Sequence, residues 1–155
     1  MKRFSLFLLL FVSVTSGAPA QANQDSVQPV PEKPHFADGV RSTMEKYLGR
    51  RYVWGASGIK SFDCSGFVWR VMFENGILVK RTTARKFYMM LEPVSKEDQW
   101  NFGTVVFFDD LKHVGIVDTA DTFYQAQTSI GTNRSQMNSF WRNKIYGFRR
   151  FPTVQ

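Results

Sequence analysis

Hydrophobic positions early in the chain recur at helical spacing. They predict a helix from about Asp38 to Leu48, which Gly49 would end as a stop signal. The run YVWG at 52–55 predicts a short extended piece, and a loop is expected at 56–58. The face of the predicted helix consists of Val40, Met44, Tyr47 and Leu48.

Two further helices are expected in the next part of the sequence. One begins close to Cys64 or Ser65, because the hydrophobic residues that follow share a helical face and an Asn-Gly pair ends the segment. The other runs towards Leu91 after Thr82 or Thr83, either of which can cap its first turn. The face of the earlier helix consists of Phe67, Val68, Val71 and Met72.

After Gly103 the pattern changes to short hydrophobic runs that turn-forming residues separate. These runs are rich in Val, Ile, Phe and Tyr, which is typical of β-strands. Helices followed by consecutive strands indicate an α+β domain with an antiparallel sheet. The predicted strands are 104–108, 114–117, 123–127 and 145–151.

The first twenty residues have the composition of an export signal. A short positive start at 1–3 precedes an apolar run at 4–14, and small residues then lead to Ala20. Cleavage after Ala20 is the first choice and cleavage after Ala22 the second. An uncleaved membrane anchor is the alternative, but the run is short for a hydrocarbon core of ~30 Å. We therefore expect a secreted or periplasmic protein with a signal peptide at 1–20 and, after its removal, no stable membrane insertion.

A polar stretch separates this signal from the folded part. Residues 21–37 contain three prolines and no apolar period, which predicts an extended spacer, and the domain is expected at 38–153. The 155 residues, of which 43% are hydrophobic, suit one domain and exclude a chain that is disordered throughout. The composition also excludes collagen and coiled coils.

The charge and the few metal-binding side chains narrow the function further. The net charge is +7, and without Lys2 and Arg3 the excess is +5, spread along the sequence. A scattered excess favours anionic surroundings such as cell wall or lipid headgroups, whereas nucleic-acid binding needs a denser basic stripe. One cysteine and two histidines exclude a disulfide framework and speak against a zinc site. We expect no metal and no cofactor, no nucleic-acid partner, and a monomer.

Cys64, the one cysteine, is the strongest candidate for chemistry. It lies in the sequence FDCSG at a predicted loop-to-helix junction, where the helix dipole and unpaired N–H groups favour a thiolate. Gly66 keeps the first helical turn slim, so that another backbone or a substrate can approach. The alternative is a small buried apolar residue. Export favours a thiol with a function, because an unpaired thiol without one is disadvantageous in an oxidising compartment.

His113, the one histidine of the predicted domain, opens the strand HVGI. With Cys64 it has the side-chain types of a thiolate–imidazolium site, in which the ring must lie close enough to the sulfur to keep it ionised. Gln125 on the next strand can accept the other ring N–H. Gln127 shares that strand face, so a register error would exchange the two glutamines. The alternatives are a structural histidine and exposed polar strand positions.

Five short motifs follow one another along the chain: YVWG (52–55), FDCSGFV (62–68), RTTA (81–84), VVFF (105–108) and HVGI (113–116). In this order they resemble the NlpC-type cell-wall cysteine peptidases, over about 38 to 151. The resemblance implies a compact papain-like fold, with N-terminal helices packed on a central antiparallel β-sheet. It also implies hydrolysis of amide bonds in peptidoglycan stem peptides, usually between the γ-carboxyl of D-glutamate and a diamino acid.

The same resemblance implies roles for individual residues. Cys64 corresponds to the nucleophile and His113 to the base, and Gln125 falls at the third polar position. Tyr52 corresponds to a tyrosine that lies beside the nucleophile and assists the oxyanion.

Asp63 and Ser65 correspond to positions that help hold the free amino end of the stem peptide. Because an acidic Asp63 opposes thiolate formation in Cys64, we expect its carboxylate to point towards the substrate.

Two alternatives stay open for the function of the whole protein. One is a non-catalytic cell-wall-binding protein on the same fold, and the other is an amidase or toxin-like hydrolase that cuts a different wall bond.

Overall fold

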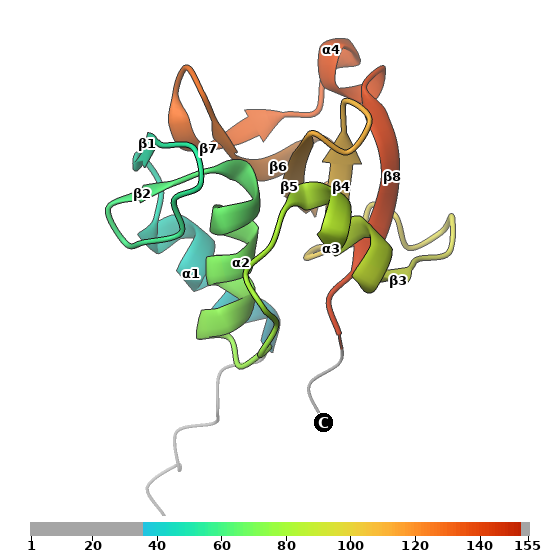
Figure 1. Cartoon of the computed structure of the whole chain (residues 1–155). Helices are drawn as coiled ribbons and strands as arrows, with labels where there is room; N and C mark the ends of the chain where they lie inside the picture. Colours follow the sequence, from blue (N-terminus) through green and yellow to red (C-terminus); the bar gives the residue numbers. More distant parts are fainter. Residues whose placement is uncertain (1–35, 153–155) are drawn as a thin grey trace, which may run out of the picture. The chain divides into compact units, whose positions relative to one another are not determined.

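The computed structural model describes residues 36–152, which form four helices and eight strands (Figure 1). The expected signal peptide at 1–20 and nearly all of the expected spacer lie outside the described residues. The elements are α1 (Phe36–Lys46), β1 (Arg51–Tyr52), β2 (Ser61–Phe62), α2 (Cys64–Glu74), α3 (Ala84–Met90), β3 (Glu92–Pro93), β4 (Val105–Phe108), β5 (His113–Thr119), β6 (Thr122–Gln127), β7 (Gly131–Gln136), α4 (Ser139–Arg142) and β8 (Ile145–Arg150).

Helix α1 begins and ends two residues earlier than its hydrophobic pattern predicts. Tyr47 and Leu48 lie in a turn, where Tyr47 N donates to Met44 O at 3.3 Å and Leu48 N donates to Glu45 O at 3.2 Å. Such three-residue bonds are tighter than those of an α-helix. Gly49 ends the turn with a φ of 74°, a conformation that favours glycine.

The predicted starts of the next two helices are confirmed. Asp63 is the N-cap of α2, where its side chain accepts a hydrogen bond from Gly66 N, so Cys64 is the first helical residue. Thr83, rather than Thr82, is the N-cap of α3 and accepts from Lys86 N.

The sheet has six strands in the order β3-β8-β4-β5-β6-β7, and every neighbouring pair is antiparallel. The α+β class and all four predicted strands are confirmed. Strand β7 was not predicted, because its sequence GTNRSQ is polar and lies at the edge of the sheet. A separate two-stranded parallel pair, β1 and β2, lies before α2 in the chain.

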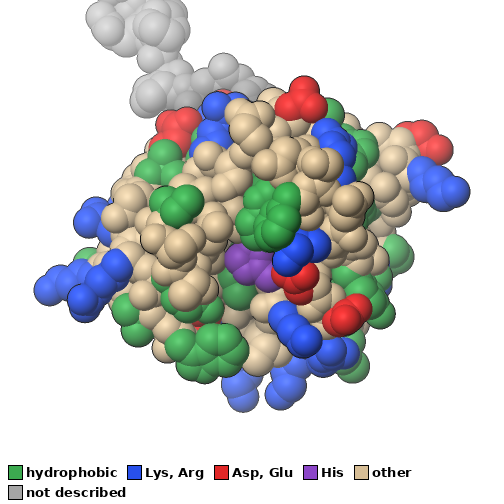
Figure 2. All heavy atoms as spheres, turned by 90° about the horizontal axis from the view of Figure 1, so that it is seen from above, with side chains coloured by type: hydrophobic (Ala, Val, Ile, Leu, Met, Phe, Trp, Pro, Cys, Tyr) green, Lys and Arg blue, Asp and Glu red, His purple; other side chains and the backbone are tan. Residues whose placement is uncertain are grey.

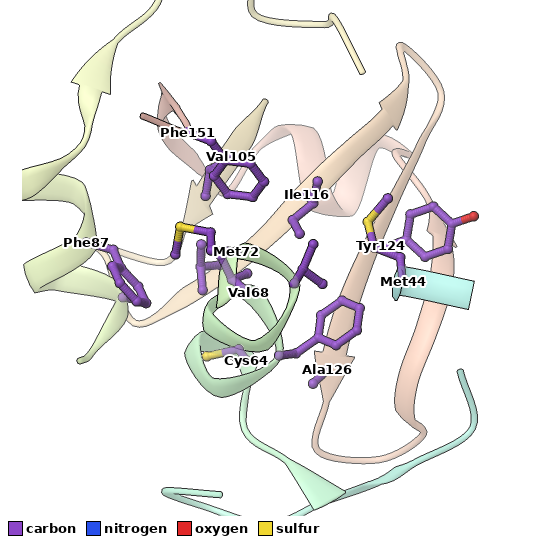
Figure 3. Packing of buried hydrophobic residues seen from close by; sticks show 14 of the residues in the cluster. Met44, Cys64, Val68, Met72, Phe87, Val105, Ile116, Tyr124, Ala126 and Phe151 are labelled. Atoms are coloured by element: carbon purple, nitrogen blue, oxygen red, sulfur yellow. The ribbon is translucent and has the colours of Figure 1, made fainter. Parts of the chain in front are cut away.

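Both faces of the central strand β4 are buried, which explains its uninterrupted sequence VVFF. Val105 and Phe107 belong to a cluster that also contains side chains of α1, α2 and α3 (Figure 3). Val106 and Phe108 belong to a second cluster, together with Phe123. Burying each such side chain stabilises the fold by about 1.5–3 kcal/mol. The sheet therefore holds the start of β5, which carries His113, between two packed layers.

A buried carboxylate ties α1 to the far edge of the sheet. Asp118 on β5 accepts hydrogen bonds from Arg41 at 2.5 Å, Arg134 at 2.7 Å and Thr122 at 2.9 Å. Burial raises the pKa of this carboxyl, but the hydrogen bonds from Arg41, Thr122 and Arg134 outweigh that effect, and the pKa lies below its ordinary value.

Within residues 36–152, no helix combines the length and hydrophobicity that crossing a bilayer would require.

Candidate active site

Cys64 lies at the N-terminal end of α2, at the margin of the first hydrophobic cluster (Figure 3). The residue is only 6% exposed, yet it borders a cleft of about 410 Å³. The cleft therefore gives a ligand access to the sulfur from one side. The other residues that line it are Tyr52, Trp54, Gly55, Asp63, Ser65, Arg81, Thr83, Ala84, Leu111 and Lys112.

The loop over the start of α2 comes unusually close to the helix backbone. A Cβ added at Gly66 would lie 2.0 Å from Ala56 O, so only glycine fits there. Ala56 O also accepts a hydrogen bond from Asp63 N at 2.9 Å. The close approach foreseen at Gly66 is therefore that of a protein backbone, which holds one wall of the cleft in place.

The sulfur of Cys64 contacts the backbone on both sides of His113. Its Sγ lies 3.9 Å from Lys112 O, and the backbone N–H of Val114 stabilises the thiolate form. The fold thus brings together two residues that are 49 positions apart. Among the described residues, however, no hydrogen bond joins Sγ to the imidazole ring.

Gln125 is the residue that orients the histidine. Its Oε1 lies 2.6 Å from His113 Nε2, and its Nε2 donates to Ser135 Oγ at 2.7 Å and to Gln127 Oε1 at 3.5 Å. Because the amide donates to Ser135, its carbonyl oxygen faces the ring. His113 Nε2 is then the donor, and Nδ1 is left without a proton. Gln127 supports Gln125 and does not take its place.

The imidazole of His113 is also held by aromatic rings. It stacks on Trp141 with centroids 5.4 Å apart and lies 5.9 Å from Phe108. Burial lowers the pKa of His113, and the hydrogen bond to Gln125 only partly offsets this effect. In the surface view, a histidine is visible next to hydrophobic and basic side chains (Figure 2). Sequence reasoning missed Trp141 and Ser135, because neither α4 nor β7 was predicted.

The N-terminus of α2 favours the thiolate of Cys64 as expected, but other effects outweigh it. Burial, followed by the charge of Asp63, raises the pKa of Cys64 to about 11. The N–H groups of Ser65 and Val114 and the charge of Arg81 act in the opposite direction but are weaker. At neutral pH both the thiol and the imidazole are therefore uncharged.

The Asp63 carboxylate, which we expected to point towards the substrate, lines the cleft but already has hydrogen-bond partners within the protein. Arg81 Nη2 donates to both of its oxygens, at 2.7 Å and 2.8 Å. The same two oxygens accept from Gly66 N at 2.6 Å, Gly55 N at 2.8 Å and Ser65 Oγ at 3.1 Å. Arg81 neutralises the carboxylate inside the protein, which limits its repulsion of a thiolate.

Tyr52 lies on the cleft wall close to the sulfur. Burial raises its pKa first, and the nearby charges of Cys64 and Asp63 raise it further. Its hydroxyl therefore stays protonated and can donate a hydrogen bond. Within the described part of the chain, no cluster of three His, Cys, Asp or Glu side chains is arranged to hold a metal ion. The cleft thus provides a thiol and hydrogen-bond donors, and the neutral imidazole of His113 follows directly after Lys112 in its lining.

Comparison with known proteins places these residues in a wider context. The sequence model of the NlpC/P60 family matches residues 49–150. The chain is 35% identical over 109 residues to the "Probable endopeptidase p60" of Listeria welshimeri, an alignment that covers 68% of this chain and 20% of that protein. It is 31% identical over 135 residues to the "Murein DD-endopeptidase MepS/Murein LD-carboxypeptidase" of Escherichia coli, covering 84% and 71%.

Solved structures agree with these sequence matches. An NLP/P60 family protein from Staphylococcus aureus, described as similar to a lipoprotein, superimposes with a TM-score of 0.68 at 26% identity, over 83% of this chain and 45% of that one. The p60 proteins are much longer, and this chain spans about a fifth of their length.

Proposed function

Because the chain belongs to the NlpC/P60 family, we propose that it is an exported cysteine endopeptidase that cleaves amide bonds in peptidoglycan stem peptides. The observation that carries the proposal is the position of Cys64 at a helix N-terminus on the wall of a cleft, against the backbone that presents His113. Relatives that share most of the domain are named endopeptidases. Export is supported by the signal-like sequence at 1–20.

The first step is attack by Cys64 on the scissile carbonyl. Since the thiol is uncharged at rest, proton transfer accompanies the attack: His113 Nδ1 takes the thiol proton while the bond between Sγ and the carbonyl carbon forms. The lowered pKa of His113 keeps the ring neutral at pH 7, so it is ready to act as a base. Gln125 Oε1 accepts the hydrogen bond from His113 Nε2–H throughout and keeps the ring in one tautomer.

The negative charge that develops on the carbonyl oxygen needs hydrogen-bond donors. The backbone N–H of Cys64, in the first turn of α2, and the Tyr52 hydroxyl are the groups that we assign to it. Both belong to the cleft region around the sulfur, and burial and the neighbouring negative charges keep Tyr52 protonated.

The second half of the reaction releases the two products. The protonated His113 gives its proton to the leaving amine as the carbon–nitrogen bond breaks, which leaves a thioester on Cys64. A water then gives a proton to His113 and attacks the thioester carbonyl. The carbon–sulfur bond breaks, the proton returns to sulfur, and the acid product leaves.

The bond that we favour joins the γ-carboxyl of D-glutamate to a diamino acid. The murein relative is named for two other bond types, so the choice of bond is a separate part of the proposal. Contact of Asp63 and Ser65 with the amino end of the peptide stays a prediction. Because both side chains already bond to each other and to Arg81, that contact would require these hydrogen bonds to rearrange.

One observation favours the non-catalytic alternative, a cell-wall-binding protein. The sulfur is nearly buried, and the pKa of Cys64 is raised to about 11, which is the reverse of an activated thiol. Purified stem-peptide fragments separate the two functions. We expect the mature protein to yield two fragments whose masses identify the cut bond, and Cys64→Ala protein to yield none. Binding of the fragments without cleavage by the unaltered protein would favour the binder.

A further inference from the structure

Lys112 is the charged residue of the cleft that pairs with no residue of opposite charge in the described range, and the catalytic steps above do not use it. Three charged residues line the cleft, and two of them, Asp63 and Arg81, neutralise each other through two hydrogen bonds. Lys112 is exposed and forms no ion pair with any residue in the described range 36–152. The lining of the cleft therefore carries one uncompensated positive charge.

The backbone that carries this charge is close to the reaction centre. The carbonyl oxygen of Lys112 lies 3.9 Å from Cys64 Sγ, and the next residue along the chain is His113. The ammonium is thus one flexible four-carbon stem away from the backbone that contacts the nucleophile. A cation at this position can reach groups next to the scissile amide of a bound substrate.

The backbone that carries Lys112 is firmly held. Asp109, Asp110 and Leu111 all have positive φ values, of 50°, 52° and 68°, and Lys112 N donates to Asp109 O at 3.0 Å. Lys144 pairs with Asp109 at 3.0 Å, and Arg85 on α3 donates to Asp110 O at 2.9 Å. Strained backbone persists where its surroundings determine it, often at functional sites. Lys112 is therefore presented from a firmly held turn that is hydrogen-bonded to α3.

We propose that Lys112 selects the substrate by binding a free carboxylate next to the scissile amide. This inference rests on the proposed function, since D-glutamate linked through its γ-carboxyl keeps its α-carboxylate free. Stem peptides with that carboxylate bind more tightly than those in which it is converted to an amide, because only the charged group pairs with the ammonium. The amide keeps the size of the group and removes its charge.

Binding to inactive protein tests the inference without relying on turnover. The probes are the tripeptide L-alanyl-γ-D-glutamyl-diamino acid and its α-amide, titrated into Cys64→Ala protein by calorimetry. We expect the free acid to bind about five- to tenfold more tightly, as for one charge-assisted hydrogen bond at a partly exposed site. The preference should shrink at high salt. The ratio of the two affinities should fall close to one in Cys64→Ala/Lys112→Met protein. Lys112→Arg in the same Cys64→Ala background should restore most of the preference.

A matched control removes a positive charge elsewhere. Lys96 is exposed and is not among the residues that line the cleft, so Lys96→Met should leave the preference unchanged. Equal binding of the two probes, or a preference that survives Lys112→Met, overturns the inference. Cleavage of the free acid by protein with Cys64 intact is measured separately. A charge preference without cleavage would refute the proposed peptidase activity and leave the role of Lys112 standing.

Discussion

Replacing Gly66 by alanine tests how the cleft is built. The added Cβ would lie 2.0 Å from Ala56 O, 3.0 Å from Ala56 C and 3.1 Å from Asp63 Oδ1. An ordinary contact between carbon and oxygen is longer by more than about 1 Å, so the loop has to move away from α2. That movement also breaks the hydrogen bond from Asp63 N to Ala56 O, which is 2.9 Å long.

The size of the effect follows from these contacts. Overpacking of this kind costs about 1–3 kcal/mol, and loss of one backbone hydrogen bond costs about 0.5–1.5 kcal/mol. Alanine returns up to about 1 kcal/mol through its helix propensity. We expect the free energy of unfolding to fall by about 2–3 kcal/mol, and the Tm by roughly 10 °C.

Urea denaturation followed by tryptophan fluorescence measures the change, and Gly58→Ala is the matched control. Gly58 lies in the same loop region, and a Cβ there would have no neighbour within 4 Å. We expect this control to change stability by less than about 0.5 kcal/mol. Gly66→Ala protein that is as stable as Gly58→Ala protein would refute the packing argument.

Three further substitutions test other parts of the structure. Asp118→Asn should lower the free energy of unfolding by about 2 kcal/mol at pH 7, since the carboxylate is buried and its arginine partners are half exposed. Because the folded pKa of Asp118 is depressed, this difference is fully present above the ordinary value of 3.8 and should vanish as pH falls through the folded pKa in urea titrations. Gln125→Ala should reduce kcat about tenfold. It should also move the acid limb of the pH–rate profile to lower pH, since Gln125 raises the pKa of His113. An equal effect of Gln127→Ala would contradict the assignment of this role to Gln125. Arg81→Met should raise the pKa of Cys64 further, because the substitution removes a positive charge and leaves Asp63 without its ion-pair partner. Alkylation with iodoacetamide across pH 8 to 12 should show this shift, and an unchanged alkylation profile would contradict the prediction.

The sequence predicts local structure well where a local cause exists. The cap of α3, which we expected at Thr82 or Thr83, and the start of α2 were predicted because capping is decided within three or four residues. The contact between Gln125 and His113 follows from neighbouring antiparallel strands. The strand pattern alone did not decide whether Gln125 or Gln127 makes this contact.

Features that depend on distant or polar partners were not predicted. Strand β7 has no hydrophobic pattern, so its Ser135, which orients the amide of Gln125, had no signal in the sequence. The Asp63 carboxylate was expected to face the substrate, but Arg81, 18 positions away, pairs with it. The thiol was expected to be ionised, and burial by residues from many elements outweighs the local effect of the helix.

The most direct test of the account is the mass of the protein quenched with acid during turnover of a stem peptide. The account predicts an added acyl fragment that peptide mapping locates on Cys64. In Cys64→Ala protein, both the added fragment and the hydrolysis should be absent. A fragment on another residue, or hydrolysis by Cys64→Ala protein at the unaltered rate, would contradict it.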